Sequence, residues 1–153
     1  MLGIYESMAK APMFEGLEEG QLESMAAGAE ELRVPAGTLV ISRGEAAERF
    51  FLVGKGTIAL EVESPGSGAV RVLTLHDSDV VGWSWLFTPH RWEVDARAVT
   101  DCHLIAVNGI RLREQCEVDH RLGYEIATRF AADALQRMKD SWYQILDLAV
   151  RDA

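Results

Sequence analysis

Short runs of β-branched and aromatic residues separated by glycines constrain the fold of this chain more than any other feature. Segment 34–45 predicts a turn, a strand and a second turn, and further strands are predicted at 49–53, 57–62 and 69–75. Glycines at the joints, among them Gly37, Gly44 and Gly56, tolerate a positive φ at which a Cβ would clash. Short strands at intervals of about eight to twelve residues predict an antiparallel sandwich or barrel and disfavour a βαβ fold.

The stretch from position 80 to 98 interrupts this pattern. Gly82 ends a strand, a short apolar segment follows, and residues 88–90 turn the chain into an alternating run. In that run Trp92, Val94, Ala96 and Ala98 share one side, and Glu93, Asp95 and Arg97 share the other. The pattern predicts a strand, a tight turn, one helical turn, a loop and a strand. The N-terminus of such a helix is suited to an anion. A last strand is predicted at 103–107.

The two ends of the chain have helical patterns. Residues 1–30 predict helices, with Pro12 interrupting the first piece, and after position 109 a short helix is predicted at 110–116 and a long one from about 121 to 150. Asp119 is a suitable N-cap for the long helix. Its apolar residues keep one seam on one face: Ala131, Leu135, Met138, Trp142 and Ile145. At about 1.5 Å per residue the helix outreaches a small domain. We therefore expect a homodimer through this helix.

Composition indicates one soluble domain over residues 1–153. The chain has 24 acidic and 15 basic side chains and a formal net charge of −9, so it lacks the basic surface of a nucleic-acid-binding protein. Cys102 and Cys116 have no partner motif for a disulfide framework or a zinc site, which predicts reduced thiols. No signal-peptide pattern and no long apolar run is present, so we expect a cytoplasmic protein without membrane contact.

The motifs that carry enzymatic chemistry are missing. His76, His90, His103 and His120 are isolated and do not form the paired pattern of a metal-binding cupin. No nucleophile elbow, Walker loop, dinucleotide fingerprint or Cys-x-x-Cys is found. We therefore expect no catalytic residue, no metal and no enzymatic activity.

The glycine spacing of residues 37–56 and the stretch 80–98 resemble cyclic-nucleotide-binding domains of the catabolite activator and protein kinase A regulatory type. The resemblance implies an antiparallel, jelly-roll-like β-roll, mainly β with flanking helices. Two positions depart from the family pattern: Trp92 stands where the family has the phosphate-binding arginine, and Trp83 where it has the glutamate that binds the ribose hydroxyl. Arg91 lies one place away. Cyclic AMP is therefore a candidate ligand that Trp83 and Trp92 disfavour, and no other cofactor is implied.

Three parts make up the predicted domain. They are a helical lead-in at 1–30, a β-roll at 31–108 containing the cassette 80–98, and C-terminal helices at 109–150, with no DNA-binding domain after them. The candidate ligand pocket lies in the cassette and comprises Gly82, Trp83, Ser84, Trp85, Leu86, Arg91, Trp92 and Glu93.

Three functions remain open at this point. The first is a non-enzymatic regulatory or sensor module that acts on an unidentified partner protein. The second is a pseudo-receptor that binds no cyclic nucleotide and serves as a dimeric interaction or scaffold subunit. The third is a transcription regulator without its helix-turn-helix, which the acidic charge and the three residues left after position 150 oppose.

Overall fold

The N-terminal part of the chain is helical and leads directly into a sheet. The structure, a computed structural model, describes residues 3–152 and begins with α1 (Ile4–Lys10), the 3-10 turn η1 (Pro12–Phe14) and α2 (Glu19–Ala27). Pro12 begins η1, which confirms the predicted interruption. The helical prediction to position 30 is wrong at its end, because Ala29 already pairs with Val107 in a strand. Positions 1, 2 and 153 lie outside the described residues.

Within residues 3–152 the strands form two antiparallel four-stranded sheets. Their bounds are β1 (Ala29–Val34), β2 (Leu39–Ile41), β3 (Arg49–Lys55), β4 (Ile58–Ser64), β5 (Gly68–Leu75), β6 (Val80–Val81), β7 (Asp95–Ala98) and β8 (Cys102–Asn108). One sheet has the order β1-β8-β3-β6 and the other β2-β7-β4-β5. This topology confirms the predicted antiparallel β-roll with flanking helices.

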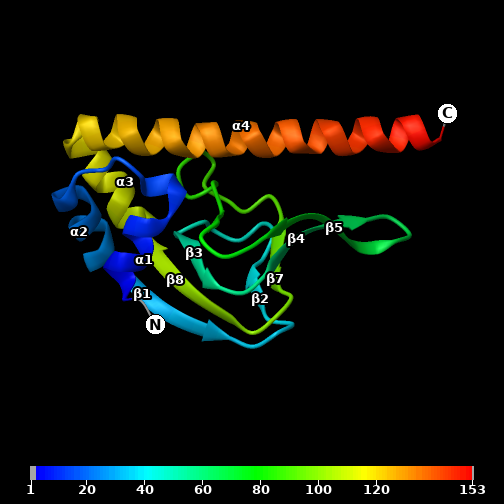
Figure 1. Cartoon of the computed structure of the whole chain (residues 1–153), viewed down its shortest axis with the longest axis horizontal. Helices are drawn as coiled ribbons and strands as arrows, with labels where there is room; N and C mark the ends of the chain where they lie inside the picture. Colours follow the sequence, from blue (N-terminus) through cyan, green and yellow to red (C-terminus); the bar gives the residue numbers. More distant parts are fainter. Residues whose placement is uncertain (1–2, 153) are drawn as a thin grey trace.

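Two helices follow the last strand. They are α3 (Gly109–Val118) and α4 (His120–Arg151), and the Asp119 side chain accepts a hydrogen bond from the Leu122 N–H, which confirms the predicted cap. α4 runs along one side of the molecule, and its C-terminal turns reach out in the same direction as the β4–β5 hairpin (Figure 1). Only its first half is buried against the body, through Leu122, Ile126 and Phe130.

An aromatic cluster joins the helices to the sheet and fixes the chain after β6. Trp85 is fully buried, with its ring centroid 4.8 Å from that of Phe50 and 5.1 Å from that of Phe130. Phe14 of η1 lies 6.4 Å from Phe50 on the same cluster. Aromatic contacts of this kind stabilise by about 0.5–1.5 kcal/mol each beyond the burial of area. The cluster therefore holds η1, β3, the cassette and α4 in one arrangement.

Candidate functional site

The cassette connects β6 to β7 through turns. Gly82 has a φ of 102°, the Leu86 N–H donates to the Trp83 carbonyl at 3.0 Å, and the His90 N–H donates to the Phe87 carbonyl at 2.9 Å. The prediction of one helical turn here is wrong: no α-helix forms between residues 82 and 94. His90, with a φ of 57°, lies in the following turn, which leads the chain toward β7. A helix N-terminus for an anion is therefore not formed.

Trp92 lies directly over Gly82. An ideal Cβ at Gly82 would come within 2.6 Å of both Cη2 and Cζ3 of the Trp92 indole and 3.6 Å from Cδ1 of Ile41. The side chain is buried among apolar residues, with 8% of Trp92 exposed. Glycine is required at position 82 for two reasons, the positive φ and the close approach of the ring. The indole thus fills the space next to the glycine that opens the cassette.

Backbone hydrogen bonds hold Trp92 in this position. Its N–H donates to the Glu45 carbonyl at 3.0 Å, and its carbonyl accepts from the Gly44 N–H at 2.8 Å. Both partners belong to the turn after β2, one of the glycine turns identified in the sequence. The ring and the turn are therefore fixed together.

The two arginines of the cassette are bonded to protein oxygens. The exposed Arg91 donates from Nη1 to the Gly44 carbonyl at 3.0 Å. Arg97 donates from Nε to Glu61 Oε1 at 3.1 Å and from Nη1 to the Gly37 carbonyl at 2.9 Å. Buried Ala96 and Ala98 alternate with half-buried Asp95 and Arg97 on β7, which confirms the predicted alternation for residues 95–98, whereas residues 92–94 precede the strand.

The remaining candidate residues do not converge on Gly82. Trp83 reaches α4, where its Nε1–H donates to Asp133 Oδ2 at 2.8 Å, and Trp85 lies in the aromatic cluster. Ser84 and Leu86 are half-buried, and Glu93 is exposed. Of the eight residues proposed for one pocket, the structure brings Gly82 and Trp92 into close contact and directs Trp83 and Trp85 elsewhere.

Contacts to α4 add residues that the sequence reasoning missed. Asp133 Oδ2, the acceptor for Trp83, lies 3.5 Å from Arg137 Nε, and Arg137 Nη2 lies 3.8 Å from Asp79 Oδ1 in the turn before β6. The i, i+4 spacing of Asp133 and Arg137 was a visible signal of an intrahelical ion pair. Nothing in the sequence connected that pair to Trp83. Together these residues tie α4 to the start of the cassette.

The predicted seam of α4 is open to solvent. Its exposed fractions are 45% at Leu135, 44% at Met138, 56% at Trp142 and 65% at Ile145, and Ala131 is exposed as well. The residues that α4 buries against the body belong to a different set. The seam is thus not used for packing within the described chain.

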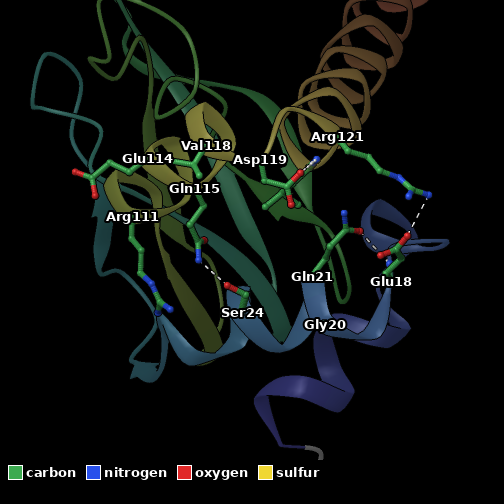
Figure 2. A pocket seen from close by; sticks show the side chains of 11 residues that line it. Glu18, Gly20, Gln21, Ser24, Arg111, Glu114, Gln115, Val118, Asp119 and Arg121 are labelled. Carbon is green, nitrogen blue, oxygen red and sulfur yellow. Dashed lines mark hydrogen bonds and ion pairs between the residues drawn. The ribbon is translucent and has the colours of Figure 1, made fainter.

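Two hollows on the surface are lined by residues other than Gly82 and Trp92. One of about 770 Å³ lies between α2, α3 and the start of α4, where Arg121 pairs with Glu18 at 3.1 Å and Gln115 donates to Ser24 (Figure 2). Another, of about 860 Å³, lies beside Leu86 and His90 and includes Cys116. Burial of the Cys116 thiol and, to a smaller extent, the nearby Asp119 carboxylate raise its pKa and so favour its protonated form.

Neither a metal site nor a membrane span is found in the described part of the chain. Residues 3–152 contain no group of three or more His, Cys, Asp or Glu side chains placed to hold a metal ion. None of their helices is long and apolar enough to cross a bilayer.

Solved structures share this fold. A candidate cyclic nucleotide-binding protein from Geobacter metallireducens GS-15 is 27% identical, with a TM-score of 0.80 over 90% of this chain and 99% of the other. The sensor domain of the transcriptional regulator DNR from Pseudomonas aeruginosa is 16% identical, with a TM-score of 0.72 over 88% and 90%. The catabolite activator protein of Thermus thermophilus is 21% identical, with a TM-score of 0.69 over 90% and 63%. No curated protein sequence matches the chain.

The match at the sequence level covers the β-roll and the first C-terminal helix. The family model for the cyclic nucleotide-binding domain matches residues 31–119, more than half of the chain. It includes both sheets apart from the first two residues of β1, and also the cassette and α3. With its antiparallel β-roll, the cassette between β6 and β7 and this match, the chain belongs to the cyclic nucleotide-binding domain family.

Proposed function

We propose that this protein is a dimeric, non-enzymatic regulatory module whose β-roll binds no cyclic nucleotide and that acts through contacts with other protein chains. The observation that carries the proposal is the Trp92 indole over Gly82, 2.6 Å from where a Cβ would stand. The resemblance puts Trp92 at the position of the phosphate-binding arginine. The residues present therefore do not fit a cyclic nucleotide.

An indole cannot replace the guanidinium at this position. It carries one N–H donor and no charge, whereas a cyclic phosphate needs a cation and several donors. Hydrogen bonds to charged groups contribute on the order of 1.5–3 kcal/mol each, and 1.4 kcal/mol is about tenfold in affinity. Losing both the arginine and the ribose-binding glutamate should weaken a cyclic nucleotide by about a hundredfold to ten-thousandfold.

Arg91 does not compensate in the observed arrangement. Its guanidinium donates to the Gly44 carbonyl, and the same turn binds the Trp92 backbone. Moving Arg91 to the phosphate position would break that bond and shift the loop by one residue, which would withdraw Trp92 from the core. The free-energy cost of both changes favours the arrangement in which Trp92 stays against Gly82.

The hydrogen bond between Trp83 and Asp133 is evidence for a regulatory module in which α4 is positioned without a ligand. In this arrangement α4 is docked on the cassette through the indole N–H and through the Arg137–Asp79 pair. These contacts favour this position of the long helix without a ligand. The exposed seam of α4 then serves a second copy of the chain, because four large apolar side chains on one helix face stabilise association when they leave water.

Calorimetry with cyclic AMP and cyclic GMP tests the closed site. The wild type should give no binding heat, whereas Trp92→Arg, and more strongly Trp83→Glu with Trp92→Arg, should bind measurably. Phe87→Arg is the matched control, since it adds a guanidinium at an exposed cassette position and leaves the indole over Gly82. Low-micromolar binding by the wild type would contradict the closed site and favour a nucleotide sensor. If both Trp92 variants fold but give no binding heat, Trp92 is not the residue that blocks the site.

A further inference from the structure

Three basic side chains form a row across three neighbouring strands, on a different part of the β-roll from the cassette. Arg33 of β1 and Lys55 of β3 are both paired with His103 of the central strand β8. Directly paired residues of an antiparallel sheet point to the same face. In a chain of formal charge −9, three basic side chains on one face are a local exception.

The middle member of the row is buried with an unused polar atom. Only 7% of His103 is exposed, and its Nε2 has no hydrogen-bond partner among the described residues. The nearest acidic group is Glu31, whose Oε2 lies 3.7 Å away, beyond hydrogen-bond range. Leaving a buried donor or acceptor unpaired is costly, so a group that binds Nε2 is favoured.

A fixed ring position makes this imidazole a suitable binding group. A Cβ at Gly54 would lie 2.8 Å from His103 Nδ1, so the ring rests against the backbone of β3 and only glycine leaves it room. The ring cannot turn toward that strand. Its Nε2 is thereby kept on the side of Glu31, whose own side chain is 42% exposed and able to move away.

A hollow of about 560 Å³ adjoins the row. Its lining comprises Arg33, Val34, Pro35, Lys55, Asp101, Cys102 and His103. Arg33 and Lys55 are exposed at its edge, and β1 runs away from the helices toward this end of the sheet (Figure 1). The Asp101 carboxylate is engaged, because its Oδ1 accepts from the Ala36 N–H at 2.8 Å. The Cys102 thiol donates to the Thr57 and Thr100 carbonyls.

We propose that this hollow binds a small oxyanion, inorganic phosphate or a carboxylate, through the Nε2–H of His103 and the side chains of Lys55 and Arg33. The anion takes the place of the Glu31 carboxylate, accepts from the imidazole, and lies between two cations. Charge-assisted bonds of this kind are shorter and stronger than neutral ones. No residue of the hollow belongs to the cassette 80–98, so the site is independent of the nucleotide position.

Nuclear magnetic resonance on the full, ¹⁵N-labelled chain tests this site. Sodium phosphate and sodium acetate are titrated separately against sodium chloride at equal ionic strength. We expect saturable shifts at Arg33, Lys55 and His103, including the signals of the His103 ring nitrogens. Lys55→Met should weaken the anion about tenfold or more. Lys10→Met is the matched control, because Lys10 is an exposed lysine of α1, and it should leave binding unchanged.

A second variant distinguishes loss of the binding site from loss of the folded structure. His103→Gln keeps a polar side chain, and if folded it should lose the saturable response and the increase in melting temperature that bound phosphate gives the wild type. Saturation with phosphate alone or acetate alone identifies the anion. Shifts that rise linearly with both salts, or equal weakening by Lys10→Met and Lys55→Met, would overturn the site.

Discussion

The indole N–H of Trp83 donates a 2.8 Å hydrogen bond to Oδ2 of Asp133, a residue fifty positions further along the chain and on a different element. This is a direct polar link between the cassette and the long helix α4. Asp133 also lies 3.5 Å from Arg137 Nε, so the carboxylate is shared between the cassette and its own helix. Removing it should therefore loosen both contacts.

Asp133→Ala should lower the free energy of unfolding by roughly 1.5–3 kcal/mol, the usual contribution of a hydrogen bond to a charged group. Urea unfolding measures that loss, and hydrogen exchange should show faster exchange in the first half of α4. Asp140→Ala is the control, because that exposed carboxylate accepts a hydrogen bond from Gln136 of the same helix. If the two variants are equally stable, the link contributes nothing to the docking of α4.

Gly82→Ala should destabilise the protein by roughly 1–3 kcal/mol, because the new methyl meets the Trp92 ring and the positive φ disfavours alanine. Gly66→Ala separates the two causes: Gly66 has a φ of 81° and open space around its Cβ position. Urea unfolding should show a larger loss at position 82 than at 66. Adding Trp92→Ala to Gly82→Ala should relieve the steric part of the destabilisation. If the losses of the two single variants simply add in the double variant, the indole does not lie against position 82.

Met138→Glu with Ile145→Glu should convert a dimer into a monomer in analytical ultracentrifugation. Both side chains belong to the exposed seam of α4, and burying an unpaired carboxylate in an apolar interface costs several kcal/mol. Gln136→Glu with Gln144→Glu adds the same charge to the same helix outside the seam and should leave the dimer intact. A wild type that sediments as a monomer at micromolar concentrations would contradict the proposed assembly.

The protein should not retard duplex DNA in a shift assay at low salt. Its net charge of −9 repels the phosphate backbone, and low ionic strength exaggerates any electrostatic attraction that exists. A basic DNA-binding protein run in parallel shows that the assay can detect binding. Retardation by the acidic chain would restore the hypothesis of a transcription regulator.

Local features of the sequence determined most of the fold. The glycines at 37, 44 and 56 have φ values of 92°, 89° and 124°, which only glycine adopts readily, so their spacing predicted the turns between strands. The Asp119 cap and the apolar spacing predicted α4 within a residue or two at each end. β1 was missed because its residues Ala29–Val34 have the burial pattern of a half-exposed edge strand and contain adjacent glutamates at 30 and 31.

The candidate site was decided by tertiary structure. Trp83, Trp85 and Trp92 follow one another within ten residues, and nothing local distinguishes an indole that bonds α4 from one that joins Phe50 and Phe130 or one that lies on Gly82. Each ring goes where its apolar area is buried, and the Trp83 N–H also reaches an acceptor, whereas Trp85 Nε1 is buried without a hydrogen-bond partner among the described residues. Those partners come from β3 and α4, which are distant in the sequence. The identity of the residues was thus sufficient to question the nucleotide, but only packing across the fold decided which ring lies on Gly82.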